Sequence, residues 1–232
     1  MSGEKGYIAV VNHTAANIHS VDKALQRVSA DARVTADARV TADADEIMGA
    51  AGIVLPGVGA SDAAMSALMR LDLVDPIKAF AATGKPVLGV CLGMQVLFDS
   101  SEEGELPLLG LIPGIVREMQ PSVNGISRKI PHMGWNAVQF TQSDNVPKIF
   151  SDTPQDTHFY FVHSYECVPA SEDDVVAVTD YGSTICAVVA RDNVIGTQFH
   201  PEKSQDRGLD IYRRFVDFSL NNTGNASGAV AI

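Results

Sequence analysis

The feature that most constrains the fold is an alternation, through the first half of the chain, of short apolar runs with segments of helical periodicity. The apolar runs are Tyr7–Val11, Gly52–Leu55 and Pro86–Val90, each of the length of a buried strand. One helix face after the first run is marked by Ile18, Val21, Leu25 and Val28. This alternation is typical of a parallel β-sheet covered by helices, so we predict an α/β fold.

The second half of the chain is rich in strand-forming residues, separated by turn residues. These stretches are Gly114–Met119, Ala137–Phe140, His158–Val168, Val175–Thr179 and Cys186–Phe199, with a hairpin turn expected at Asp192-Asn193. No linker divides the chain. We therefore predict a central mixed sheet with additional antiparallel strands in one domain over residues 7–220. Residues 1–6 are expected to form a tail, and residues 221–232 a disordered one.

Charge and cysteine content exclude several classes of function. Lys and Arg number 17 and Asp and Glu 28, so the formal charge is 17 − 28 = −11, which argues against nucleic acid and anionic membranes as partners. The apolar run near the N-terminus is too short for a signal peptide or a membrane span. Cys91, Cys167 and Cys186 are widely spaced, without the pairs typical of a zinc site or a disulfide framework. We expect a reducing, cytoplasmic compartment, no metal and no cofactor.

A six-residue segment is repeated in tandem. Ala30–Thr35 and Ala36–Thr41 both have the sequence Ala-Asp-Ala-Arg-Val-Thr. Two copies do not make a repeat fold. We interpret the repeat as a duplication in which one copy forms an edge strand and the other a surface loop. A surface loop tolerates an insertion at small cost.

The strongest signal for chemistry is Gly89-Val90-Cys91-Leu92-Gly93, which has glycines on both sides of a nucleophile. It follows a predicted strand and precedes a helix expected to begin at Met94–Phe98, which is the setting of a nucleophile elbow. The helix N-terminus would favour a thiolate and offer N–H groups to an oxyanion. Alone, the motif also fits a buried structural cysteine.

A second signal is His200-Pro201-Glu202, after the last predicted strand. A residue before proline is held extended, and extended residues at i and i+2 point the same way. His200 and Glu202 can then lie side by side as a base and the carboxylate that orients it.

A third signal is Pro56-Gly57-Val58-Gly59, after the second buried run. Its glycines let the backbone approach a substrate and present an N–H group to an oxyanion. A dinucleotide-binding loop is the weaker alternative, because Asp62 replaces the third glycine and the loop does not follow the first strand.

Together these segments resemble the class I, triad-type glutamine amidotransferases, which implies a flavodoxin-like fold. Three further segments are similar to the glutaminase subunits of imidazole glycerol phosphate synthase: Pro131–Asn136, Phe161–Tyr165 and Gly196–Ser204. The resemblance runs from about Tyr7 to Phe218. It departs at Thr14–Asn17, where the family usually has Gly-x-Gly-Asn, and at Ala60-Ser61, where it has a bulkier residue.

The resemblance implies that Cys91, His200 and Glu202 hydrolyse glutamine to glutamate and ammonia through a thioester. It places Gln95 and the backbone of Gly57, Gly59, Ser164 and Tyr165 at the substrate, and the N–H groups of Leu92 and of the Val58–Gly59 strand at the oxyanion. It also implies a (β/α)₈ cyclase partner in a heterodimer, which uses the ammonia in histidine biosynthesis and gates the glutaminase. Trp135, Tyr160 and Lys203 are the expected docking residues.

Two other readings of the chain are possible. One is a stand-alone hydrolase of this fold, such as a γ-glutamyl peptidase, or the glutaminase of another synthetase, against which Pro131–Asn136 argues. The other is a thiol redox sensor or a regulatory protein without activity, against which the intact Cys91, His200 and Glu202 argue. His132 and His163 lie in motif segments without an assigned chemical role.

Overall fold

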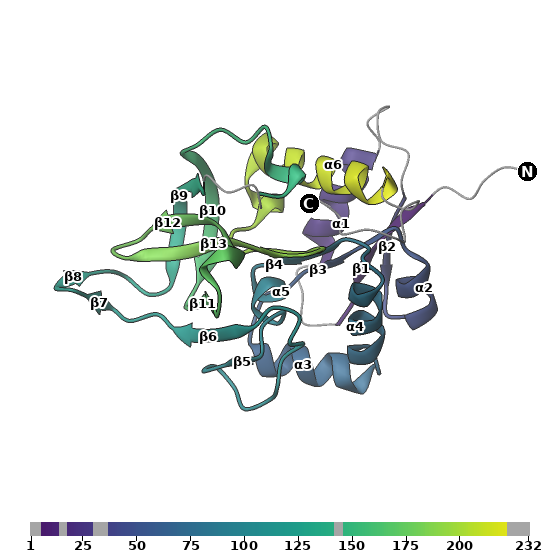
Figure 1. The fold of residues 1–232 in the computed structure, drawn as a ribbon, viewed down its shortest axis with the longest axis horizontal. Coiled ribbons are helices and arrows are strands. Elements are labelled where there is room, and N and C mark those ends of the chain that lie inside the picture. Colours follow the sequence, from purple (N-terminus) through teal and green to yellow (C-terminus); the bar gives the residue numbers. More distant parts are fainter. Residues whose placement is uncertain (1–5, 14–17, 30–36, 142–145, 222–232) are drawn as a thin grey trace, which may run out of the picture.

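The computed structural model describes residues 6–13, 18–29, 37–141 and 146–221 (Figure 1). Its helices are α1 (Ile18–Ser29), α2 (Ala44–Gly49), α3 (Ser61–Arg70), α4 (Val74–Ala82), α5 (Leu92–Gln95) and α6 (Gln205–Asn221), with 3₁₀ turns η1 (Lys148–Phe150), η2 (Glu172–Asp174) and η3 (Pro201–Lys203). The strands of the first half are β1 (Tyr7–Val11), β2 (Asp37–Thr41), β3 (Gly52–Leu55), β4 (Val87–Val90), β5 (Ser100–Ser101) and β6 (Gly114–Glu118). Those of the second half are β7 (Ser122–Val123), β8 (Ile126–Ser127), β9 (His132–Phe140), β10 (Thr157–His163), β11 (Tyr165–Pro169), β12 (Val175–Asp180), β13 (Thr184–Arg191) and β14 (Val194–Thr197).

Within the described part of the chain, nine strands form one sheet in the order β10-β9-β12-β13-β14-β4-β3-β1-β2. The strands from β14 to β2 run parallel to one another, and those from β10 to β13 are antiparallel. The α/β prediction with a mixed sheet is therefore confirmed. β14 joins the two halves, since it pairs in parallel with β4 and antiparallel with β13.

Helices cover both faces of the parallel half (Figure 1). Successive side chains of a strand point to opposite faces, so Ile8 and Val10 pack with α1 and α6, whereas Ala9 and Val11 pack with α2, α3 and α4. This two-sided burial explains why the first-half strands are continuous apolar runs.

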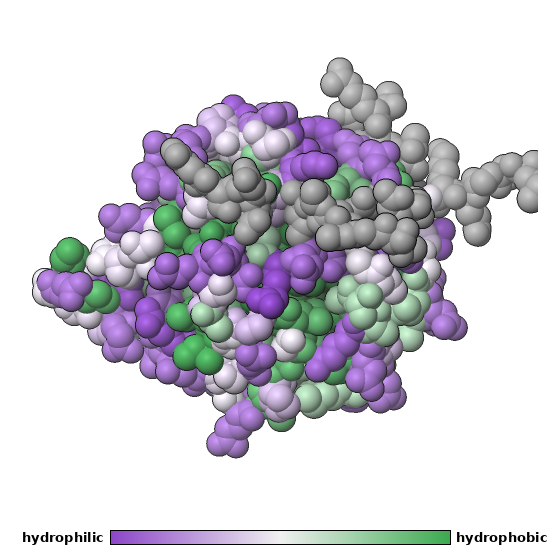
Figure 2. Space-filling view, viewed as in Figure 1, coloured by the Kyte–Doolittle hydropathy of each residue, from purple (hydrophilic) through white to green (hydrophobic). Residues whose placement is uncertain are grey.

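The antiparallel half differs from the sequence prediction in several places. β9 begins at His132 rather than at the expected Ala137, and the hairpin of β7 and β8 was not predicted. His158–Val168 was expected as one stretch, but it breaks at Ser164 into β10 and β11, which lie in different sheets. The hairpin turn expected at Asp192-Asn193 is confirmed between β13 and β14, with Asp192 at φ 52°. The tip of the β7–β8 hairpin carries Ile126, 57% exposed, among the largely hydrophilic surface seen in Figure 2.

The second copy of the tandem repeat supplies the edge strand, because Asp37–Thr41 pairs in parallel with β1. The first copy lies outside the described residues, as do the Thr14–Asn17 loop, residues 1–5 and residues 222–232. The helix α6 ends at Asn221, one residue beyond the predicted domain limit. The limits of the domain stay a prediction. In the part of the chain that the structure describes, no helix has the length and apolarity to cross a bilayer.

Candidate active site

Cys91 stands at a sharp turn between β4 and α5, with φ 54° and ψ −107°. A positive φ is strained for any residue with a side chain and is typical of functional sites. The flanking glycines are required by close packing: a Cβ on Gly93 would lie 1.7 Å from the Leu55 carbonyl oxygen, and one on Gly89 would lie 2.5 Å from the Gly93 oxygen. The backbone thus has the geometry of a nucleophile elbow.

The helix after the elbow is shorter than expected. A helix was predicted to begin at Met94–Phe98, but α5 covers only Leu92–Gln95 and continues as a tighter turn. The carbonyls of Val96, Leu97 and Phe98 accept hydrogen bonds from the backbone of residues 109–112 instead of from a further helical turn. Free N–H groups at the helix start remain available to an anion, but a four-residue helix has little macrodipole.

His200 and Glu202 form a buried pair, each with 1% of its side chain exposed, and His200 Nδ1 lies 2.7 Å from Glu202 Oε1. The expected contact is present, but the backbone reasoning was wrong. The strand ends at Thr197, and Pro201–Lys203 forms the 3₁₀ turn η3 that carries Glu202 back beside the ring. The backbone N–H of His200 donates to the Tyr160 carbonyl at 2.9 Å, which anchors the turn on β10.

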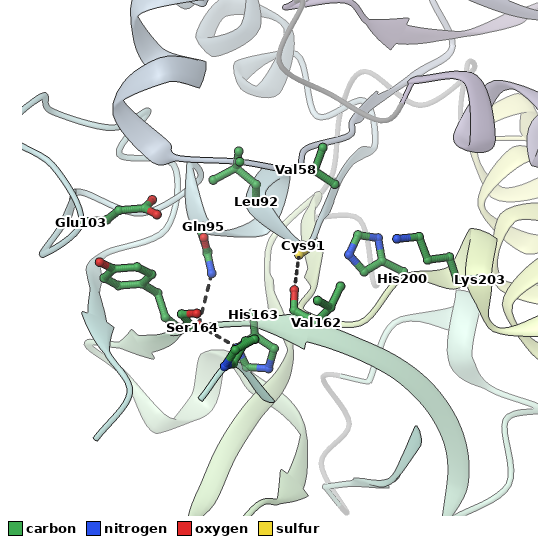
Figure 3. Close-up of a pocket in the computed structure, with 13 residues that line it drawn as sticks. Val58, Cys91, Leu92, Gln95, Glu103, Val162, His163, Ser164, His200 and Lys203 are labelled. Atoms are coloured by element: carbon green, nitrogen blue, oxygen red, sulfur yellow. Dashed lines mark hydrogen bonds between the residues drawn. The ribbon is translucent and has the colours of Figure 1, made fainter. Parts of the chain in front are cut away.

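The charge state of His200 reflects its neighbours. Burial lowers its pKa, but Cys91 and the Glu202 carboxylate more than offset this and raise the pKa to about 9. Since a carboxylate only accepts, Nδ1 carries a hydrogen. Nε2 makes no hydrogen bond within the described residues and lies on the side of Cys91 (Figure 3). The geometry places a protonated imidazole beside the Cys91 sulfur.

The Cys91 sulfur also has contacts that the sequence analysis missed. Cys91 Sγ lies 3.8 Å from the Val162 carbonyl oxygen, and Gln198 Nε2 lies 3.8 Å from Cys91 Sγ. Gln198 is fully buried, and its Oε1 accepts from Gln95 Nε2 at 3.4 Å. Gln198 lies two residues before His200, in the same motif, but its position gave no sign that it faces the nucleophile.

A cavity of about 450 Å³ opens over Cys91 (Figure 3). The predicted site residues that line it are Val58, Gly59, Cys91, Leu92, Gln95, Ser164, Tyr165, His200 and Lys203. Segments from both halves of the chain thus meet at the carboxyl end of β4, which is where open α/β sheets bind ligands. Among the described residues, no three His, Cys, Asp or Glu side chains are grouped as a metal site.

Gly57 and Glu202 lie behind the cavity wall. Gly57 is buried against α5, where a Cβ would lie 2.6 Å from Leu92 Cβ, so this glycine permits close packing of the loop on the elbow. Glu202 does not line the cavity, and its buried side chain contacts His200. The cavity also includes Glu103, whose Oε2 accepts from the backbone N–H of Ser61 at 2.6 Å. Glu103 was missed because it lies in a loop without periodicity.

His163 lines the cavity beside Ser164, and His132 packs against it. His163 Nδ1 donates to the Tyr165 carbonyl at 2.8 Å, and the rings of the two histidines meet at 2.9 Å. His132 Nε2 lies 2.9 Å from Asn136 Oδ1. Burial, and next the neighbouring His132, lower the pKa of His163 to about 3, so this ring is neutral. The pair holds the Tyr165 backbone in place.

The three expected docking residues lie together beside the cavity. The rings of Trp135 and Tyr160 meet edge to face with centroids 6.0 Å apart, and Lys203 Nζ lies 5.7 Å from the Tyr160 ring centroid. Trp135 is 45% exposed. Of the three, Lys203 lines the cavity over Cys91, whereas Trp135 lines a neighbouring pocket. A large half-exposed aromatic residue is typical of a contact surface.

Comparisons with known proteins agree with this geometry. The model of the family "Glutamine amidotransferase class-I" matches residues 9–217. The imidazole glycerol phosphate synthase subunit HisH of Synechocystis sp. is 47% identical over 212 residues, covering 91% of this chain and 96% of its own. The HisH subunit of Moorella thermoacetica is 41% identical over 220 residues, covering 94% and 98%.

Solved structures with low sequence identity share the fold. A crystal structure of a glutamine amidotransferase has a TM-score of 0.69 at 18% identity and covers 92% of this chain and 99% of its own. PurLQS from Thermotoga maritima has a TM-score of 0.67 at 19% identity, covering 92% and 99%. The chain therefore belongs to the class I glutamine amidotransferases and, within them, to the HisH subunits of imidazole glycerol phosphate synthase.

Proposed function

We propose that this chain hydrolyses L-glutamine to glutamate and ammonia with Cys91, His200 and Glu202, as the glutaminase of an imidazole glycerol phosphate synthase in histidine biosynthesis. One observation carries the proposal. A cysteine held at positive φ in an elbow faces a buried His200–Glu202 pair at the floor of a cavity. Packing alone does not account for a strained cysteine beside a charged, buried imidazole.

In the first step the Cys91 thiolate attacks the side-chain amide carbon of glutamine, and the carbonyl oxygen becomes an oxyanion. The Leu92 N–H, at the first position of α5, is one donor to this oxygen, because such groups have no partner within the helix. A backbone N–H of the Val58–Gly59 strand is the second. Each donor of this kind contributes about 3 kcal/mol to the transition state.

In the second step the tetrahedral intermediate collapses, the C–N bond breaks and His200 gives the Nε2 proton to the leaving nitrogen. The products are ammonia and a γ-glutamyl thioester on Cys91. His200 then takes a proton from water, whose oxygen attacks the thioester carbon. The C–S bond breaks, glutamate leaves, and the Cys91 thiolate is restored beside the protonated His200. Glu202 keeps the proton of the imidazole on Nδ1 throughout, so that Nε2 is the atom that exchanges protons.

The far end of the cavity suits the amino-acid end of glutamine. Glu103 brings a carboxylate for the α-ammonium group, and only one of its oxygens, Oε2, is engaged by the Ser61 N–H. Gln95 and the backbone of Ser164 and Tyr165 offer polar groups at the same wall. We assign them to the binding of the substrate rather than to its chemistry.

The proposed partner is the (β/α)₈ cyclase subunit, in a heterodimer. Ammonia released into water is protonated and lost as a nucleophile, so a partner that receives it must cover the cavity. We assign the docking surface to Lys203, which lines the cavity, and to Tyr160 and Trp135, which follow it through ring contacts. The cyclase would use the ammonia to form imidazole glycerol phosphate. A reducing, cytoplasmic location is part of the proposal and accords with three unpaired, buried cysteines.

Labelling tests the assignment of the nucleophile. Iodoacetamide or a chloroketone analogue of glutamine should alkylate Cys91, and glutamine should protect it. Cys167, which is buried and has a pKa raised well above the ordinary value by its desolvation, is the internal control and should stay unlabelled. Equal labelling of both cysteines, or labelling of Cys91 without protection by glutamine, would contradict the proposal.

A further inference from the structure

We propose that His13 is a positioning residue of the glutaminase reaction, which holds the carbonyl of Pro56 and thereby fixes the oxyanion loop. We use this name for Pro56–Ser61. The inference rests on the proposed function, since it assumes that this loop supplies a donor to the oxyanion. His13 belongs to no motif of the sequence analysis.

The contact joins the ends of two neighbouring parallel strands. β1 and β3 pair in parallel, so the residues that follow them emerge at the same edge of the sheet. His13 comes two residues after β1, and Pro56 directly after β3. His13 is 3% exposed, and its Nε2 lies 2.7 Å from the Pro56 carbonyl oxygen. A buried hydrogen bond of this length fixes the orientation of the Pro56–Gly57 peptide.

The chemistry of the contact determines the tautomer of His13. A carbonyl oxygen only accepts, so the hydrogen must be on Nε2. Burial lowers the pKa of the ring, which leaves it neutral with a lone pair on Nδ1. Nδ1 has no hydrogen-bond partner among the described residues. The ring is therefore a fixed donor to the oxyanion loop and has no part in proton transfer at Cys91.

The oxyanion loop is held at its ends and open in its middle. Pro56 is held by His13, and the N–H of Ser61 is held by Glu103 at 2.6 Å. Between them, Gly59 is exposed at φ 99°, and a Cβ on it would meet nothing within 4 Å. Val58 reaches the cavity near Leu92 and Cys91 (Figure 3). Gly57 packs on α5, so Val58 and Gly59 take their position from Gly57 and from the two held ends of the loop.

This arrangement predicts an effect on turnover rather than on substrate affinity. The oxyanion forms only after Cys91 has attacked, and an interaction made only in the transition state changes kcat and not KM. His13 does not line the cavity, so its removal leaves the glutamine contacts in place. A misplaced donor typically costs ten- to a hundredfold in rate.

The test compares His13→Phe with His13→Gln in the complex with the cyclase subunit and its nucleotide ligand. Phenylalanine fills the space without a donor, whereas the glutamine amide places an N–H near the position of Nε2. We expect kcat for glutamate release to fall at least tenfold in His13→Phe with KM within twofold, and to recover in His13→Gln. Iodoacetamide should label Cys91 at the wild-type rate in both variants, because alkylation needs no oxyanion donor.

Several results would overturn the inference. These are an unchanged kcat in His13→Phe, equal losses in the two variants, or a parallel loss of Cys91 labelling, which would mean that the elbow itself is disturbed. If the variants fold poorly, ¹⁵N NMR of the wild-type ring decides, because a hydrogen on Nδ1 instead of Nε2 contradicts the contact. A wild-type complex without glutaminase activity would instead refute the proposed function.

Discussion

Replacing Glu202 by glutamine tests the assignment of the His200–Glu202 pair. The change keeps the shape of the side chain and removes its charge. In the wild type, the carboxylate accepts from His200 Nδ1 at 2.7 Å with both side chains buried, so solvent screens the interaction little. The amide oxygen of glutamine can still accept this hydrogen, but without the charge.

The magnitude follows from the kind of hydrogen bond. A bond to a charged group contributes about 1.5–3 kcal/mol and a neutral one about 0.5–1.5 kcal/mol, so the imidazolium loses about 1–1.5 kcal/mol of stabilisation. This lowers the pKa of His200, now raised to about 9, by roughly one unit. The rate should fall about five- to tenfold. It should fall further if the amide N–H₂ faces the ring and imposes the wrong tautomer, a change that costs about 10⁴ in serine triads.

The assay is glutamate release by the complex at saturating glutamine. Asp174→Asn is the matched control, because Asp174 is also a buried carboxylate in an ion pair, with Arg191 at 3.1 Å, but lies outside the site. We expect the control to lower the melting temperature and to keep its kcat. A Glu202→Gln variant that is folded and within twofold of wild-type kcat would refute the reasoning, as would an equal loss in Asp174→Asn.

Three further predictions concern packing, pH and docking. A Cβ at position 57 would lie 2.6 Å from Leu92 Cβ, so Gly57→Ala should lower the free energy of unfolding by about 1–3 kcal/mol and slow glutamate release at least tenfold. A Gly57→Ala variant with wild-type stability and activity would refute this packing role. The His200 pKa of about 9 exceeds its ordinary 6.5, so its contribution to stability is complete below pH 6.5 and is lost as the pH rises through 9. Between pH 6.5 and 9 the free energy of unfolding, measured by denaturant titration, should therefore fall less in His200→Asn than in the wild type. An equal fall in the two proteins would contradict the raised pKa. Trp135→Ala should weaken cyclase binding by calorimetry roughly thirtyfold, or about 2 kcal/mol, with Cys91 labelling unchanged; unaltered binding would remove Trp135 from the docking surface.

The first half of the fold follows closely from the sequence, because the parallel strands are buried on both faces. Such strands must be continuous apolar runs, and Tyr7–Val11 and Gly52–Leu55 match β1 and β3 residue for residue. The elbow was equally predictable, since its glycines are imposed by contacts as close as 1.7 Å. At these positions the local backbone and the tertiary packing require the same residue types.

Other features depend on partners distant in the chain. α5 ends at Gln95 because the backbone of residues 109–112 takes the next carbonyls, which no periodicity within the helix reveals. The break at Ser164 arises because β10 and β11 pair with strands of different sheets. The turn that brings Glu202 to His200 is a 3₁₀ helix, although the pairing itself could be predicted from the His-Pro-Glu motif.

The cavity residues also divide into those that the local sequence indicates and those that depend on distant parts of the chain. Cys91, His200 and Glu202 stand in motifs whose residue types already indicate chemistry, and Ser164 and Tyr165 were found through a resemblance. Glu103, Gln198 and His13 had no such signal, because each acts through a contact with a segment far away in sequence. Gly57 was placed at the substrate but lies beneath the cavity wall, a distinction that only the packing of the loop on α5 reveals.

The most direct test of the account is glutamate release from glutamine by the chain in complex with the cyclase subunit and its nucleotide ligand. The wild type and Cys91→Ala would be measured side by side, each also without the cyclase. The account predicts strong release by the wild-type complex, weak release by the wild-type chain alone and none by Cys91→Ala. Release that survives in Cys91→Ala, or a wild-type complex that releases no glutamate, would contradict it.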